Sequence, residues 1–144
     1  MPPPRATPTF IHKMRQFHCG IELPNFLPNE FCCPCCGDER LQKNTLLKIQ
    51  HLRDILSMPI SIVEGGGWRC AQFDPNEHSA HRSGYAADLA ISNIHYYQVV
   101  SNAILLGFTG IGIKNRNGKY QLHLDNAVNL PGIRPRPWIW TYDT

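Results

Sequence analysis

The segment Ser79-Ala80-His81-Arg82-Ser83-Gly84-Tyr85-Ala86-Ala87-Asp88-Leu89 joins a polar turn to the start of an apolar strand. Its histidine and its aspartate are seven positions apart, with a glycine between them. Because Gly84 permits the torsions of a tight loop, His81 on that loop and Asp88 on the strand can approach one another. Imidazole and carboxylate are common zinc ligands, and a catalytic zinc needs three protein ligands and one open position. We therefore expect a third ligand further along the chain.

A predicted β-hairpin supplies this third ligand. The pair Asn117-Gly118 separates two β-type runs, which is a strong hairpin signal. Alternation along the second run places Leu122 and Leu124 on one face and Gln121, His123 and Asp125 on the other. His123 thus completes a set with His81 and Asp88 that suffices for tetrahedral zinc. For Asp88, an ion pair with an arginine is the alternative, because a buried carboxylate needs a partner.

Length and composition describe one soluble globular domain. The chain has 144 residues, of which 42% are hydrophobic and 17% charged. We expect a flexible lead-in over residues 1–9 and a single domain over 10–144, with an irregular wrapping segment at 10–31. No apolar run is long enough for a transmembrane segment, and the net charge of +3 is too small to indicate a nucleic-acid partner. Residues 1–5 show no signal peptide, which predicts cytoplasmic synthesis.

Two helices and a small sheet are expected. Apolar residues at helical spacing predict a helix over 46–56 and a second one around 99–106. The expected start and stop residues are Asn44 or Thr45 and Pro59 for the first helix, and Ser92 or Asn93 and Gly107 for the second. Strands are expected at 60–63, 89–91 and in the hairpin, with a closing strand or apron in 131–144. This order predicts an α+β fold, with a small mostly antiparallel sheet and helices packed on one side.

The cysteines form a second motif. Cys32-Cys33-Pro34-Cys35-Cys36 contains two overlapping Cys-x-x-Cys pairs. His18, Cys19 and Cys70 are the available completing ligands, none at a spacing that decides between them. A structural metal, a disulfide that links the cluster to Cys70, and free thiols all remain open. A nucleic-acid-binding zinc ribbon would need a second knuckle, so no nucleic acid is expected.

These motifs resemble the zinc D-alanyl-D-alanine carboxypeptidase and endopeptidase family, in particular its short single-domain branch from bacteria and phages. The resemblance rests on Ser79-x-His81-x-x-Gly84-x-Ala86-x-Asp88, on Gly110-Ile111-Gly112 and on His123-Leu124-Asp125. It extends to the Cys-containing first segment at 31–37, the helix at 46–59, the arginine loop at 63–70 and the tail residues Arg136, Trp138 and Tyr142. The arginine loop departs from the family's Ser-Gly-Tyr-Arg, since it reads Gly66-Gly67-Trp68-Arg69 and keeps only the arginine.

The resemblance implies a hedgehog/DD-peptidase-like fold and a zinc peptidase that cleaves a peptide bond in peptidoglycan stems or cross-links. It implies that His81, Asp88 and His123 are the zinc ligands. Arg69 would line the cleft and bind a substrate carboxylate or carbonyl, or else hold the glycine loop. Ser79 would support the site or contact substrate, unless it serves the turn alone. Such a protein would act on the cell wall after lysis or phage delivery.

The general base is the weakest part of the pattern. Relatives carry Glu or His two or three residues before the last ligand, where this chain has Tyr120 and Gln121. Asp125 shares a strand face with His123, so it is expected to act as the base or, alternatively, to orient a histidine. Glu77 and His78 are lesser candidates. This departure favours a rival function, an inactive zinc-bearing relative that binds cell-wall peptide or a protein partner. A further rival is a structural or nucleic-acid-binding protein centred on the cysteines.

Overall fold

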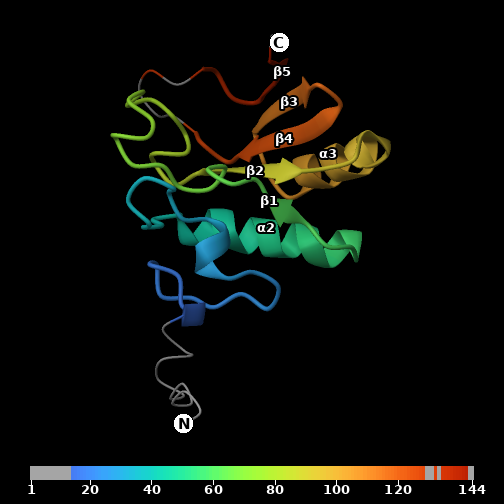
Figure 1. Cartoon of the computed structure of the whole chain (residues 1–144). Coiled ribbons are helices and arrows are strands. Elements are labelled where there is room, and N and C mark those ends of the chain that lie inside the picture. Colours follow the sequence, from blue (N-terminus) through green and yellow to red (C-terminus); the bar gives the residue numbers. More distant parts are fainter. Residues whose placement is uncertain (1–13, 129–131, 133, 143–144) are drawn as a thin grey trace.

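A five-stranded sheet forms the centre of the computed structural model, which describes residues 14–128, 132 and 134–142 (Figure 1). Its strand order is β1-β2-β4-β3-β5. The strands are β1 (Ser61–Ile62), β2 (Ala86–Ala90), β3 (Gly110–Arg116), β4 (Lys119–Asp125) and β5 (Trp138–Thr141). All neighbours pair antiparallel except β3 and β5, which are parallel. The predicted α+β class and mostly antiparallel sheet are confirmed, whereas the expected lead-in at 1–9 lies outside the described residues.

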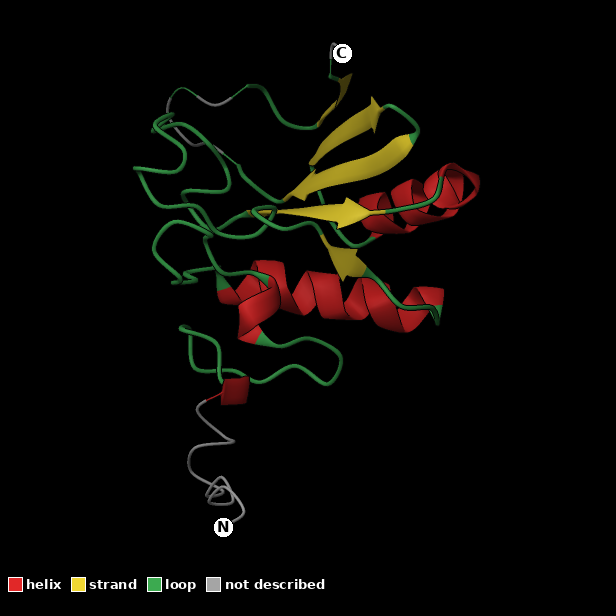
Figure 2. Ribbon diagram, viewed as in Figure 1, coloured by secondary structure: helices red, strands yellow, loops and turns green. Residues whose placement is uncertain are grey.

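Two α-helices cover one face of this sheet (Figure 2). They are α2 (Lys43–Leu56) and α3 (Tyr96–Leu105), and two short 3₁₀ turns, η1 (Pro28–Glu30) and η2 (Asn93–His95), precede them. Leu52 of α2 and Val99 of α3 belong to the same buried cluster as Leu122 of β4. The helices therefore pack on one side, as predicted, and the opposite face of the sheet is left for polar residues. No helix of the described part of the chain has the length and apolar character needed to cross a bilayer.

The start of the first helix differs from the prediction. Helix α2 begins at Lys43 after an extended Gln42, so Asn44 and Thr45 lie in its first turn rather than at its cap. Thr45 is buried, and its hydroxyl donates to Asn126 Oδ1 at 2.6 Å. This tertiary hydrogen bond uses the oxygen that a cap would need. The helix ends where Ser57 adopts the left-handed conformation, just before Pro59.

The second helix also begins differently. Ser92 makes no capping hydrogen bond, and Asn93 opens the 3₁₀ turn η2 instead of starting α3. The C-terminal prediction is confirmed, because Gly107 follows the last turn with φ +91°. The hairpin prediction is confirmed as well, since Asn117 and Gly118 both have positive φ, as a two-residue turn of type I′ requires.

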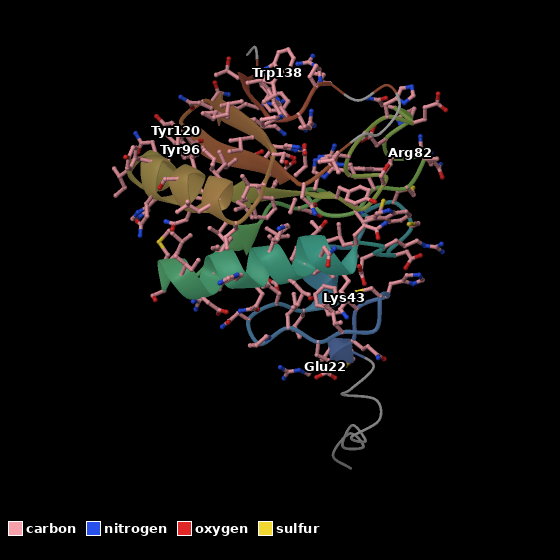
Figure 3. All side chains as sticks on the ribbon, turned by 180° about the vertical axis from the view of Figure 1, so that it is seen from behind. Glu22, Lys43, Arg82, Tyr96, Tyr120 and Trp138 are labelled. Carbon is pink, nitrogen blue, oxygen red and sulfur yellow. The ribbon has the colours of Figure 1, made fainter. Side chains whose placement is uncertain are left out.

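The irregular segment before α2 packs under the helices. Phe31 makes edge-to-face contacts with Phe17 and Phe26, with ring centroids 5.6 Å apart in both pairs. All three rings are buried, so the predicted wrapping segment contributes to the core although it has almost no regular structure. In Figure 3, Tyr96 of α3 and Tyr120 of β4 lie together at one side of the molecule, and Arg82 lies among the loops at the opposite side.

Candidate functional site

His81, Asp88 and His123 meet on the sheet face that the helices leave open. Strand pairing places Asp88 of β2 directly opposite His123 of β4. His81 reaches them from the loop before β2, where Gly84 has φ +83° and an added Cβ would lie 2.4 Å from the carbonyl oxygen of Arg40. The three residues are 2–5% exposed. The structure thus brings together the residues that the sequence singled out.

The three facing atoms form a nearly equilateral triangle. His81 Nε2 is 3.2 Å from His123 Nδ1, which is 3.1 Å from Asp88 Oδ1, and the third side measures 3.4 Å. Zinc bonds of about 2.0–2.1 Å in a tetrahedron place ligand atoms about 3.3–3.4 Å apart. The spacing and the donor types therefore fit a zinc ion held by two imidazoles and one carboxylate.

The hydrogen bonds on the outer side of each imidazole set its tautomer. His81 Nδ1 lies 2.9 Å from the carbonyl oxygen of Gly67, and His123 Nε2 lies 2.8 Å from Asp125 Oδ2. Because a carbonyl and a carboxylate only accept, both of these nitrogens carry the hydrogen. The lone pairs of His81 Nε2 and His123 Nδ1 consequently point at each other and at a carboxylate oxygen. Either a metal ion or a proton on His123 Nδ1 that is donated to Asp88 satisfies these acceptors, and the outer support is typical of metal-binding histidines.

The second oxygen of Asp88 is held by two cations. Arg69 Nη2 lies 3.1 Å and Lys114 Nζ 3.4 Å from Asp88 Oδ2. The predicted alternative of an arginine partner is thus present together with the histidines rather than instead of them. The two cations orient the carboxylate so that Oδ1 alone faces the imidazoles.

Burial and hydrogen bonding shift the pKa values of the triad in different directions. Burial raises the pKa of Asp88, but hydrogen bonds with His123 and His81 outweigh it and hold this pKa well below its usual range. Burial lowers the pKa of His81, and the hydrogen bond to Asp88 offsets only part of that effect. For His123 burial also lowers the pKa, but hydrogen bonds to Asp125 and Asp88 raise it above its ordinary value. These directions favour the ionised form of Asp88 and the neutral form of His81, which are the forms that bind a metal.

Asp125 lies behind His123 rather than in the cleft. It is 0% exposed, and Arg136 donates to both of its oxygens, from Nε at 2.9 Å and Nη2 at 2.8 Å. The backbone N–H of Ala127 is a further donor. Burial raises the pKa of Asp125, but hydrogen bonds with His123 and Arg136 lower it to about 2. This geometry suits the expected alternative, in which Asp125 orients a histidine.

Arg69 connects the glycine loop to the site. Its Nε donates to the carbonyl oxygen of Gly65 at 2.8 Å, and its Nη1 lies 3.4 Å from Asp74 Oδ2. The hydroxyl of Ser79 also hydrogen-bonds Asp74. Ser79, Asp74 and Arg69 thus form a polar chain that ends on Asp88, and both Arg69 and Ser79 line the cleft.

A cleft of about 940 Å³ opens over the triad. Its walls carry more basic than acidic side chains, namely Arg69, Lys114, Arg116, Arg134 and Arg136 against Glu64, Asp74 and Asp88. Trp140 of β5 lies beside His123, with ring centroids 5.3 Å apart, and Tyr142 lies under Lys114 Nζ at 4.4 Å. The arrangement suits an anionic ligand with apolar portions.

Three glycines leave room for side chains in and behind the site. A Cβ at Gly66 would lie 2.8 Å from Asp88 Cβ, and one at Gly110 would lie 2.3 Å from both oxygens of Asp125. At Gly112 it would lie 2.6 Å from Tyr142 Cε2. The Gly-Ile-Gly stretch of β3 is therefore required by the polar residues that pack on it.

The sequence did not indicate some of these residues. No sequence motif includes Lys114, Asp74 or Trp140. Lys114 and Trp140 reach the site because the sheet places β3 and β5 beside it, and Asp74 reaches it from a loop. Alternation in β3 from Gly112 would have placed Lys114 on the site face, which was the one available signal. Glu77 and His78 contact one another at 3.5 Å, and of these two only His78 lines the cleft.

The cysteine cluster is brought together in part. Cys33, Cys36 and Cys70 offer sulfur atoms within 4.8 Å of one another. Cys32 instead donates from its thiol to the carbonyl oxygen of Asn29 at 3.2 Å. All six cysteines are free thiols, so no disulfide links the cluster to Cys70 in this structure.

Neither a scan against protein-family models nor a search of curated proteins finds a match to this chain. The fold and the two clusters together define an α+β protein with two candidate metal centres, one of His₂Asp type and one of cysteines.

Proposed function

We propose that this protein is a zinc metallopeptidase with a hedgehog/DD-peptidase-like fold that cleaves a peptide bond in peptidoglycan stem peptides or cross-links. The observation that carries the proposal is the convergence of three lone-pair atoms at 3.1–3.4 Å, each held from behind by a hydrogen-bonding partner. The motif resemblance to zinc D-alanyl-D-alanine peptidases supports the same assignment.

In this proposal His81, Asp88 and His123 hold the zinc. Bound zinc supplies a Lewis acid that polarises a peptide carbonyl and lowers the pKa of a water molecule. Arg69 and Lys114 keep Asp88 ionised and in position, and Gly67 and Asp125 keep the two imidazoles in the tautomers that ligation requires. Asp125 is a positioning residue in this scheme. Glu64 and His78, which line the cleft, are the proposed proton acceptors.

The cleft supports the proposed substrate. Stem peptides of peptidoglycan end in a carboxylate, and a guanidinium binds a carboxylate through two parallel hydrogen bonds. Arg134 and Arg136 line the cleft from the tail, while Arg116 lines it from the end of β3. Arg136 already donates to Asp125 and to the carbonyl oxygen of Arg134. We therefore infer that Arg116 and Arg134 attract the anionic peptide end, with Trp140 packing against its apolar part.

The test is to measure zinc content and hydrolysis of purified muropeptides for the same preparations. The unmodified protein is expected to release a peptide fragment or D-alanine, and His81→Ala to lose both the zinc of this site and the activity. His51→Ala, an exposed histidine on α2, is the matched control and should change neither. Hydrolysis that persists in His81→Ala would refute the proposal.

A second candidate is a catalytically inactive relative that binds a cell-wall peptide or a protein partner. It is favoured by one observation, that Asp125 is fully buried and engaged with Arg136, while Tyr120 and Gln121 stand where relatives carry Glu or His. Zinc bound at full occupancy, saturable binding of muropeptides and no turnover of any of them would support this candidate instead.

A further inference from the structure

The cysteines form a second cluster at the loop end of the molecule. Cys33 Sγ and Cys70 Sγ are 3.6 Å apart, and Cys36 Sγ lies within 4.8 Å of both. Zinc–sulfur bonds of about 2.3 Å in a tetrahedron place sulfur atoms about 3.8 Å apart. Cys35 is exposed and does not belong to this group of three sulfur atoms.

Backbone N–H groups point at two of these sulfur atoms. Cys33 Sγ accepts hydrogen bonds from the backbone N–H groups of Cys70, Cys36 and Cys35. Cys36 Sγ accepts one from Asp38, so both cysteines accept from the residue two positions ahead. Gly37, at φ +75°, lets the chain turn back so that its N–H reaches the carbonyl oxygen of Cys33 at 2.8 Å. Repeated N–H donation to sulfur is what a metal-bound thiolate requires.

We propose that Cys33, Cys36 and Cys70 bind a structural zinc ion that is separate from the His81, Asp88 and His123 centre. Sites with three or more cysteine ligands are typical of structural rather than catalytic zinc. The assignment does not depend on the peptidase activity, because it rests on sulfur atoms that take no part in the cleft.

This zinc would lie beside the loop that supports the His81, Asp88 and His123 centre. Cys70 directly follows Arg69, and three residues earlier the carbonyl oxygen of Gly67 accepts the hydrogen of His81 Nδ1. Trp68 N–H donates to the carbonyl oxygen of Phe31 at 2.8 Å, which joins the same loop to the segment that carries Cys33. A zinc that links Cys33 and Cys36 to Cys70 therefore fixes the loop from which Arg69 and Gly67 support the other centre.

The experiment counts metals in the full chain purified with a reducing agent. Elemental analysis and non-denaturing mass spectrometry should find two zinc ions per chain in the unmodified protein and one in His81→Ala. Cobalt loading should give thiolate-to-cobalt charge-transfer absorption in the near ultraviolet, unchanged in His81→Ala and lost in Cys36→Ser. Cys36 is exposed, which makes this substitution compatible with folding. Cys32→Ser is the matched control and should keep both ions and the absorption, because its thiol points to Asn29.

A measurement on the unmodified chain keeps the test independent of any variant. A mercurial thiol reagent should release one of the two zinc ions and leave the other bound. A single zinc per chain with no thiolate-to-cobalt absorption would overturn the proposal, as would a disulfide that involves Cys33, Cys36 or Cys70 in the freshly purified protein. Loss of activity with two zinc ions present would count against the peptidase function alone.

Discussion

The two clusters of metal-ligating side chains are held by different parts of the structure. Asp88 and His123 stand opposite each other on hydrogen-bonded strands, and only His81 comes from a loop. Cys33, Cys36 and Cys70 all come from loops, 34 positions apart between Cys36 and Cys70. A strand ladder fixes the relative positions of its side chains, whereas a loop cluster depends on the bonds made within it.

This difference predicts different responses to substitution. The strand-held centre is expected to keep its geometry without a metal and to be sensitive to changes in charge. The geometry of the loop-held cluster is expected to depend on the close approach of the backbone at Gly67 to the backbone at Phe31. The two are joined at Gly67 and Trp68, where the loop that ends in Cys70 packs against Phe31 and supports His81.

The largest effect is expected from Asp88→Asn. The amide cannot neutralise Arg69 and Lys114, so Arg69 keeps only its longer contact with Asp74 and Lys114 loses the carboxylate of Asp88. Removing one partner of a buried ion pair costs about 3–5 kcal/mol of unfolding free energy. Chemical denaturation of the metal-free protein measures this, and zinc at the His/Asp centre should be lost. If stability were unchanged, the ion pairs of Asp88 would contribute nothing and the strand-held centre would owe its geometry to packing alone.

Gly67→Ala tests the connection between the two centres. An added Cβ would lie 2.3 Å from the carbonyl oxygen of Phe31, so the loop must move away from that segment. We expect a loss of about 3 kcal/mol in unfolding free energy, at the upper end of the cost of overpacking, and weaker zinc binding at both centres. Ser61→Ala, at an exposed position of β1 shortly before this loop, is the control. Unaltered zinc affinities in Gly67→Ala would show that the two centres are independent.

The Asp125→Asn variant distinguishes two roles of Asp125, positioning of His123 and action as the general base. If Asp125 orients His123, zinc affinity at the His/Asp centre should fall about 10- to 100-fold, as measured by competition with a chelator. A general base would instead give a lower kcat with zinc affinity unchanged. The loop-held cysteine cluster should keep its zinc in either case.

The pH dependence of the unfolding free energy provides a second test of the hydrogen bonds made by Asp125. Its pKa is lowered from 3.8 to about 2 in the folded protein, so its contribution is present above pH 4 and is lost as the pH falls toward 2. The difference corresponds to about 2 kcal/mol at 1.36 kcal/mol for each pKa unit. Unfolding of the metal-free protein between pH 5 and 2 should show this loss, and Asp125→Asn should show a shallower one. Parallel curves for the two proteins would contradict the assignment.

The smallest effect is expected far from both centres. Gly118→Ala places a side chain at φ +78° in the β3–β4 turn, which costs about 1 kcal/mol. Zinc content and activity should be unchanged, because the strands continue to pair in the same register. A loss of zinc in this variant would mean that the register of β4, and with it His123, depends on the turn.

Much of the fold could be predicted because it depends on local patterns. The Asn-Gly pair specified the hairpin, alternation placed His123 and Leu124 on opposite faces, and helical spacing located α2 and α3. The predicted start of α2 was wrong because a tertiary contact overrides capping preference, as the hydrogen bond from Thr45 to Asn126 shows. The predicted start of α3 was wrong because the 3₁₀ turn η2 precedes that helix. Lys114 and Asp74 were missed because their roles depend on distant partners.

The sequence by itself determined which residues could meet, because strand period, turn chemistry and ligand type are properties of short segments. Only the tertiary structure decided how they meet. It placed Asp125 behind His123, gave the second oxygen of Asp88 to Arg69 and Lys114, and brought Cys70 to Cys33. These contacts join segments far apart in the chain, and their geometry is set by the packing of the whole sheet and its loops.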